Sequence, residues 1–274
     1  MPLIQILVLA LIQGLTEFLP ISSSGHLILV PALTGWQDQG LAVDVAAHVG
    51  TLVAVLIYFW RDVGRMLTGI ARLFVGRVDP GAKLAGFLLI GTIPALGAGY
   101  LIDEYAGDLF RRVEIVAWTL IGFGLLLWIA DRIGLTIRRV EHMTLAQALF
   151  VGFAQALAFI PGTSRSGITM TAARLVGFER QEAARFSFLL AIPAISAAGL
   201  WKGYELYETG STAELQIAIM TASLCVLTGL FAIAFMMQWL KRANFTPFVI
   251  YRLLLGGLLL YLIYVEGWWA PAPG

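Results

Sequence analysis

Long apolar stretches, separated by short polar ones, dominate this chain. Six of them are long enough to cross a bilayer as a helix, which takes about 20 residues. They are Leu41–Trp60, Leu84–Leu101, Val113–Ala130, Ala184–Trp201, Ile217–Leu240 and Pro247–Val265. The pattern therefore predicts an all-α, polytopic membrane protein.

Two further apolar regions, 3–35 and 145–180, are interrupted near their middle by proline, serine and glycine. Proline and glycine end helices, and serine caps the next one. We expect each region to form a re-entrant helix–loop–helix hairpin. Non-helical backbone is tolerated at that depth only beside protein or a water-filled cavity.

Composition agrees with this prediction, since 59% of the 274 residues are hydrophobic and only 13% are charged. A soluble domain carries about 25% charged residues. Residues 1–274 read as one membrane domain, because no stretch is polar or long enough to form a second one. A net charge of +1 argues against a nucleic-acid partner, and the single Cys225 excludes a disulfide framework or a thiolate zinc site.

The polar loops alternate in charge. Lys and Arg gather in residues 61–83, 131–144 and 241–242, whereas 102–112 and 202–214 are rich in acids. The positive-inside rule places the basic loops in the cytoplasm and both termini outside. The first hairpin then enters from outside and the second from inside.

The two hairpins also resemble each other. Gln13–Gly25 and Gln155–Gly167 share a spacing at an offset of 142 residues. With the alternating loops, this predicts an inverted repeat with halves at about 1–130 and 145–267. Such repeats place their site near the midplane, where broken helices meet.

Three charged or titratable side chains, Glu17, His26 and Arg165, lie inside these hairpins. Each costs several kcal/mol at membrane depth, to an order of magnitude, unless it faces a cavity and is paired. The loop 162–167 adds hydroxyls, an arginine and a helix N-terminus, which together suit a phosphate. The alternative is a capped turn whose arginine pairs with a carboxylate.

The sequence allows more than one chemical role for the polar residues of the first hairpin. Glu17 is expected to bind a divalent cation or act as a base, and Gln13, one turn earlier, could add an amide oxygen or bond to another helix. His26 is a candidate nucleophile or acid–base catalyst, with a purely structural hydrogen bond as the alternative. Asp44 and His48 either line the cavity or form a structural pair.

Two arginines outside the loops, Arg174 and Arg185, flank the second hairpin near its expected cytoplasmic end. Arginine side chains at such positions commonly extend their charged heads to the membrane surface. We therefore expect both to snorkel.

The two motifs, Gln13-Gly-Leu-Thr-Glu17 with Ser22-Ser-Ser-Gly-His26 and Pro161-Gly-Thr-Ser-Arg-Ser-Gly-Ile-Thr169, resemble those of the undecaprenyl-diphosphatase family, also called the bacitracin-resistance protein family. The resemblance covers essentially the whole chain. It implies interlocked inverted repeats and a site open to the periplasm. Gln13 stands where some members have glutamate.

The resemblance further implies hydrolysis of undecaprenyl diphosphate to undecaprenyl phosphate and inorganic phosphate, which recycles the cell-wall lipid carrier and gives bacitracin resistance. Its expected setting is the bacterial inner membrane. The expected partners are a polyprenyl diphosphate substrate and a Mg²⁺ or Ca²⁺ ion, and the sequence leaves open whether the protein forms a homodimer. Glu17, His26, Arg165 and Ser23 fall on its catalytic positions, and Glu17 and Gln13 on its metal site. The expected phosphate-binding residues are Ser22, Ser24, Gly162, Thr163, Ser164, Ser166 and Thr169.

Two other protein classes share parts of this pattern. Type 2 phosphatidic acid phosphatases also use SGH and SR fragments, but they need a histidine and an aspartate where this chain has Thr171 and Leu175. That family is rejected. A flippase for the polyprenyl phosphate stays open, because inverted repeats and broken helices are typical of transporters.

Overall fold

The computed structural model describes residues 2–36, 40–106, 112–209 and 212–268. Within these ranges the chain is helical, with a single isolated bridge between Arg138 and Phe178. The helices are α1 (Leu3–Thr16), α2 (Ser23–Thr34), α3 (Leu41–Tyr58), α4 (Trp60–Leu73), α5 (Pro80–Ala106), α6 (Val113–Ile133), η2 (Val140–His142), α7 (Leu145–Ala156), η3 (Leu157–Phe159), α8 (Arg165–Leu175), α9 (Arg180–Thr209), α10 (Thr212–Trp239) and α11 (Thr246–Tyr264). The predicted all-α class is confirmed.

Each expected span coincides with a helix, namely α3, α5, α6, α9, α10 and α11. In the described part of the chain, α5, α6, α10 and α11 are each long and apolar enough to cross a membrane, and α3 with α4 forms a fifth candidate that is bent by 82°. Six spans with two re-entrant hairpins remain a prediction. The bundle exposes large apolar side chains on these helices, which suits lipid: Leu227, Phe231, Leu254 and Leu258.

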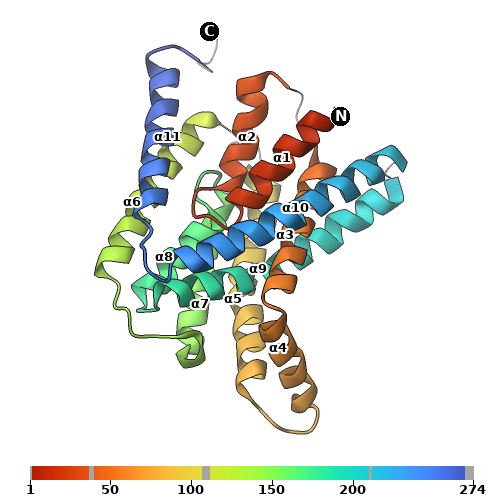
Figure 1. The fold of residues 1–274 in the computed structure, drawn as a ribbon, viewed down its shortest axis with the longest axis vertical. Coiled ribbons are helices and arrows are strands. Elements are labelled where there is room, and N and C mark those ends of the chain that lie inside the picture. Colours follow the sequence, from red (N-terminus) through yellow and green to blue (C-terminus); the bar gives the residue numbers. More distant parts are fainter. Residues whose placement is uncertain (1, 37–39, 107–111, 210–211, 269–274) are drawn as a thin grey trace.

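The first helix of each hairpin packs against the other half of the chain. Helix α1 lies along α10, and α7 lies along α5 (Figure 1). Helix α3 packs between α9 and α10, and α6 pairs with α11. The start of α1 and the end of α11 lie at one end of the molecule, whereas the turn between α4 and α5 lies at the opposite end.

Helix α4 was expected as a charged loop. It forms because its apolar residues recur at helical spacing, so Met66 and Gly69 are buried while the arginines stay outside. It packs closely on the start of α5: a Cβ at Gly69 would come within 2.3 Å of the Ala82 nitrogen. The chain therefore continues past α3 as a helical hairpin.

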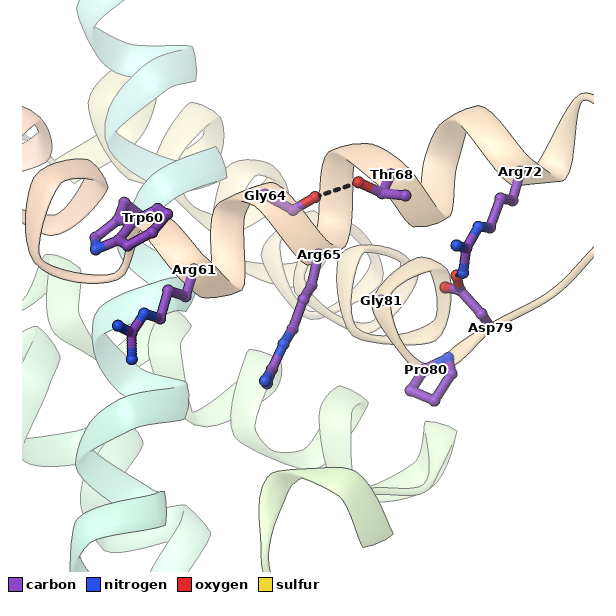
Figure 2. Close-up of a pocket in the computed structure, with 9 residues that line it drawn as sticks. All are labelled: Trp60, Arg61, Gly64, Arg65, Thr68, Arg72, Asp79, Pro80 and Gly81. Atoms are coloured by element: carbon purple, nitrogen blue, oxygen red, sulfur yellow. Dashed lines mark hydrogen bonds and ion pairs between the residues drawn. The ribbon is translucent and has the colours of Figure 1, made fainter.

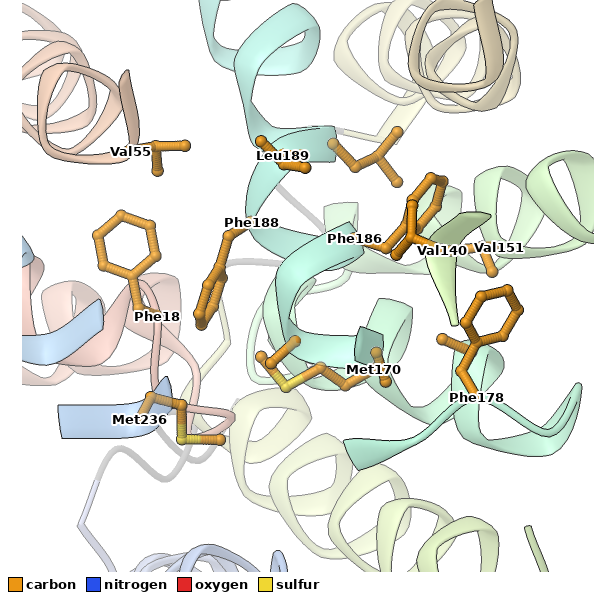
Figure 3. Packing of buried hydrophobic residues seen from close by; sticks show 14 of the residues in the cluster. Phe18, Val55, Val140, Val151, Met170, Phe178, Phe186, Phe188, Leu189 and Met236 are labelled. Atoms are coloured by element: carbon orange, nitrogen blue, oxygen red, sulfur yellow. The ribbon is translucent and has the colours of Figure 1, made fainter. Parts of the chain in front are cut away.

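The main core lies around the two hairpin loops. Its aromatic members include Phe18, Phe178, Phe186 and Phe188, all fully buried (Figure 3). Phe18 packs edge-on against Phe188 of α9 with ring centroids 5.3 Å apart. Because Phe18 follows Glu17 directly, this contact fixes the end of α1 where the polar residues begin.

Both hairpin loops end in a serine cap, as predicted. Ser22 Oγ accepts a hydrogen bond from the Gly25 nitrogen at 3.2 Å, and Ser164 Oγ accepts one from the Gly167 nitrogen at 3.1 Å. The two serines have φ values of 76° and 73°, which non-glycine residues rarely adopt. They are 142 residues apart, so the repeated sequence produces the same strained cap twice. Strain of this kind clusters at functional sites.

The expectation that Arg174 and Arg185 snorkel is wrong. Arg174 is fully buried and its Nε donates to Asp131 Oδ1 at 3.1 Å. Arg185 donates to Asp62 of α4 at 2.6 Å and also pairs with Glu141 and Glu182. Glu182 lies one turn before Arg185 on α9, but Asp131, Asp62 and Glu141 come from distant segments, so the sequence around each arginine did not reveal these partners.

Candidate active site

An ion pair between Glu17 and Arg165 joins the two hairpin loops. Glu17 is the residue after α1, and Arg165 is the first residue of α8; its Nη2 donates to Glu17 Oε1 at 2.8 Å. The second oxygen, Oε2, accepts from Ser23 Oγ at 2.7 Å and from Gln13 Nε2 at 3.1 Å. Four of the predicted site residues thus form one connected cluster.

This cluster opens into a cavity of about 380 Å³. Ser23 and Ser24 bring the first turn of α2 to its wall, and Arg165 brings the first turn of α8. The N–H groups at a helix N-terminus lack intrahelical acceptors and favour anions. Two such termini beside a guanidinium make the wall suited to a multiply charged phosphate group. The remaining lining residues are Glu17, Asp44, Val45, His48, Ala95, Gln155, Ala158, Phe159, Ala194, Ile195 and Gly199.

Asp44 and His48 of α3 line this cavity. His48 Nε2 lies 3.7 Å from Glu17 Oε2, while its Nδ1 donates to the Asp44 carbonyl at 2.7 Å. The carbonyl can only accept, so Nδ1 carries a proton and Nε2 faces the acid. Of the two alternatives for this pair, the cavity position is the one observed.

Most of the predicted phosphate-binding hydroxyls are bonded within the protein. Ser166 Oγ donates to the Leu19 carbonyl at 3.1 Å, and Thr169 Oγ1 lies 2.6 Å from Ser187 Oγ. Ser22 and Ser164 cap their helices, and only Ser24 of this group lines the cavity. Gly162 adopts φ +86°, and a Cβ there would come within 2.1 Å of Thr119 Oγ1. These residues shape the loops, and their contact with a phosphate stays a prediction.

His26 lies on α2, three residues after Ser23 and on the same face, but it is not among the described residues that line the cavity. Its Nδ1 donates to the Ser22 carbonyl at 2.7 Å. Its Nε2 lies 2.6 Å from the hydroxyl of Tyr251, and the two rings are nearly parallel. Both ring nitrogens therefore have a fixed partner.

A buried arginine of α11 forms hydrogen bonds to both hairpin loops. Arg252 of α11 is fully buried, and no carboxylate among the described residues pairs with it. Instead its guanidinium donates to five backbone carbonyls at 2.9–3.2 Å. These belong to Pro20 in the first loop, Gly162 and Thr163 in the second, and Thr119 and Leu120 of α6.

Several buried polar atoms near the site have no partner within the described structure. They are Gln13 Oε1, both amide atoms of Gln155, and Thr163 Oγ1. Gln155 is 2% exposed and is one of the residues that line the cavity. Orphaned groups of this kind call for an explanation such as a bound polar ligand.

A divalent cation fits these residues only together with the substrate. The described residues hold no group of three or more acids, histidines or cysteines that could form a metal site by themselves. Glu17 would supply one carboxylate, and Gln13 Oε1, which has no hydrogen-bond partner in the described structure, would supply one amide oxygen. Mg²⁺ is commonly held by one or two carboxylates plus substrate phosphates, which is the set available here.

A second hollow, of about 690 Å³, lies between α4 and the start of α5 (Figure 2). Its wall contains three arginines, and Arg72 turns toward Asp79 with 3.0 Å between Nη1 and Oδ2. The Ala82 N–H and Arg72 lower the pKa of the Asp79 carboxyl. None of the predicted site residues lies here, so this hollow is separate from the Glu17–Arg165 cluster.

The sequence reasoning missed Tyr251, Arg252 and Ser187. Tyr251 and Arg252 lie in an apolar span, 225 and 232 residues along the chain from their partners His26 and Pro20. The one available signal was the charge of Arg252 inside an apolar stretch, the criterion that had identified Arg165. Tyr251 and Ser187 carry no such signal.

Comparison with known proteins agrees with the motifs. The family described as "Bacitracin resistance protein BacA" matches residues 6–258. Undecaprenyl-diphosphatase 1 of Rhodospirillum rubrum is 50% identical over 99% of both chains. The undecaprenyl-diphosphatase of Hahella chejuensis is 51% identical over 96% of this chain and 98% of its own, and that of Ruegeria pomeroyi is 48% identical over 96% and 100%. With a family match over almost the whole length and relatives at about half identity, the chain belongs to the BacA bacitracin resistance family.

Proposed function

We propose that this protein hydrolyses undecaprenyl diphosphate to undecaprenyl phosphate and inorganic phosphate, and so recycles the lipid carrier for cell-wall synthesis. The observation that carries the proposal is the cavity in which Glu17, Arg165 and two helix N-termini meet. The names of the relatives point to the same reaction. A substrate with a polyprenyl tail also explains why the site lies among apolar helices.

The residues divide the chemistry between them. Arg165 has the planar fork that matches phosphate oxygens, and with the N–H groups of α2 and α8 it stabilises charge on the transferring phosphoryl group. Ser23 donates to Glu17 and faces the cavity, so it supplies or orients the attacking oxygen. His26, on the same face of α2, exchanges a proton with the reacting oxygens.

A divalent cation would be held by Glu17 and by the free amide oxygen of Gln13, with the diphosphate completing its coordination. When bound, it neutralises phosphate charge. Arg165 occupies one oxygen of Glu17, so the protein alone offers few ligands and the substrate is needed to complete the site.

Removing divalent cations is expected to abolish turnover, by a factor on the order of 10² or more, because the diphosphate then keeps its full charge. Gln13→Glu is expected to remain active and to reach half-maximal rate at lower Mg²⁺, since a second carboxylate is added. Activity measured against Mg²⁺ after EDTA treatment checks both, with Glu17→Gln as the variant that high Mg²⁺ does not rescue. Full activity in EDTA would remove the cation from the proposal.

Phosphate release from undecaprenyl diphosphate by the purified protein in detergent tests the reaction itself. Detergent removes the two sides that a flippase needs, so release there supports hydrolysis independently of transport. Glu17→Gln, measured in parallel, controls for contaminating phosphatases. If the wild type releases no phosphate while reconstituted vesicles show lipid movement, the transporter alternative replaces this proposal.

We further propose that the protein lies in the bacterial inner membrane with its cavity open to the periplasm. The basic turn between α4 and α5 lies at the end of the molecule opposite the two terminal helices, which supports their placement on different sides. The acid-rich loops used for orientation fall partly on residues 107–111 and 210–211, outside the described chain.

Cysteine labelling of intact cells is expected to reach Thr34→Cys, at the end of α2, but not Phe74→Cys, after α4. Phe74 is 89% exposed, so its protection would come from the membrane barrier and not from the fold. The only native cysteine, Cys225, is buried and gives little background. Labelling of Phe74→Cys before membranes are opened would reverse the orientation.

A further inference from the structure

A tyrosine outside both sequence motifs holds the imidazole of His26. Tyr251 lies on α11, and its hydroxyl is 2.6 Å from His26 Nε2. The rings are inclined by 9° with centroids 5.7 Å apart. The two residues lie 225 positions apart in the chain, so only the packing of α11 beside the first hairpin brings them together.

The hydrogen bonds of His26 determine which nitrogen can react. The Ser22 carbonyl accepts from Nδ1 at 2.7 Å, so Nδ1 carries a proton. In the neutral imidazole the lone pair then lies on Nε2, where the Tyr251 hydroxyl donates to it. The hydroxyl oxygen thus occupies the place from which Nε2 would exchange a proton with a reacting oxygen.

The position of Tyr251 is fixed by the next residue on α11, Arg252. Arg252 is fixed by five carbonyls from both loops and α6, which prevents α11 from sliding relative to the first hairpin. Tyr251 is 41% exposed, so its ring can move without disturbing the core. A partly exposed side chain on a rigid helix is suited to orient a catalytic group.

From this geometry we propose that Tyr251 is a positioning residue for the reaction: it fixes the ring orientation and the proton arrangement of His26, and gives up Nε2 when the substrate phosphate arrives. The inference rests on the proposed proton-transfer role of His26. It predicts that the tyrosine hydroxyl affects the chemical step more than substrate binding, because it touches His26 and not the cavity.

The test is Tyr251→Phe, which keeps the ring beside His26 and removes only the hydroxyl. We expect kcat to fall about tenfold with KM nearly unchanged, as for loss of an orienting contact. A matched control lies on the same helix: Tyr261 donates to Glu266 at 2.8 Å, away from the site, so Tyr261→Phe should leave kcat unchanged.

A second measurement reports how accessible the Nε2 lone pair of His26 is. Carbethoxylation by diethyl pyrocarbonate, read by peptide mass spectrometry, should modify His26 several-fold faster in Tyr251→Phe, because the Nε2 lone pair is uncovered. His48 and His142 serve as internal references, and faster modification of all three would mean loosened folding and would contradict the proposal. Unchanged kcat and unchanged His26 modification in Tyr251→Phe overturn it as well.

His26→Ala separates the two possible failures. If that variant keeps wild-type turnover, His26 has no part in the reaction and the role of Tyr251 falls with it. If His26→Ala is inactive while Tyr251→Phe behaves as wild type in both measurements, the proposed function stands and only the inference about Tyr251 is wrong.

Discussion

Arg165→Ala is expected to lower kcat/KM by a factor on the order of 10³ or more, the range seen when a clamp on a transferring phosphoryl group is lost. The guanidinium donates to Glu17 at 2.8 Å and, through its other nitrogen, to the Ser187 carbonyl at 3.3 Å. These contacts aim it at the cavity wall formed by α2 and α8. Arg165→Lys keeps the charge but loses the fork, so it should not restore activity.

The Arg165→Ala protein should still fold. Glu17 retains its hydrogen bonds from Ser23 and Gln13, and removal of a mostly buried charge relieves part of a desolvation cost. Phosphate release and the thermal midpoint in detergent, measured on monodisperse protein, check both statements. Turnover within tenfold of wild type would show that Arg165 is structural.

Arg174→Ala provides the contrast. Arg174 is fully buried against Asp131 and lies at the other end of α8, away from the cavity. Its removal leaves the buried Asp131 carboxylate with Arg180 as its one ion-pair partner among the described residues, so stability rather than chemistry should suffer.

Arg252→Met is expected to lower both stability and activity. Methionine replaces much of the volume, but five carbonyls lose the guanidinium as a donor, among them three in the two hairpin loops. An unsatisfied buried acceptor costs about 1–3 kcal/mol, and for a chain of this size about 1 kcal/mol corresponds to roughly 2–4 °C. We therefore expect a thermal midpoint lower by about 5–10 °C, and kcat/KM lower by about 10²-fold because the two loops lose their common anchor.

Arg242→Met is the matched control for this change, because Arg242 is exposed in the turn after α10. It should leave the midpoint and the rate unchanged. The thermal midpoint and the rate of Arg252→Lys should lie between those of wild type and Arg252→Met, since one ammonium reaches fewer carbonyls than a guanidinium. Wild-type stability and rate in Arg252→Met would show that the loops hold their positions without it.

Local sequence was sufficient for the helices and for the loops that break them. Apolar length predicted the six helices that coincide with expected spans, because a segment surrounded by lipid must satisfy its backbone internally. Proline, glycine and serine predicted the breaks and the caps at Ser22 and Ser164, because capping depends on residues only three positions apart. Prediction from apolar length missed α4, because its arginines indicated a polar loop.

The cost of burying charge identified Glu17 and Arg165 before any contact was known, and the structure places them 2.8 Å apart. The same argument applied to Arg252 and was not made, because its stretch reads as an ordinary span. For Arg174 and Arg185 the rule of snorkelling failed, since most of their acids lie on other helices, namely α6, α4 and η2.

The sequence by itself determined the all-α membrane class and the two helix pairs broken by a loop, since each depends on composition or on neighbours within a helical turn. It also predicted the residue types of a phosphate site. Only the tertiary structure decided which groups meet. Tyr251 contacts His26, Arg252 bonds to carbonyls of both loops, and His48 lies beside Glu17. The physical reason is that helix packing depends on the shape of whole helix faces, so contacts across 31 to 232 residues leave no local pattern.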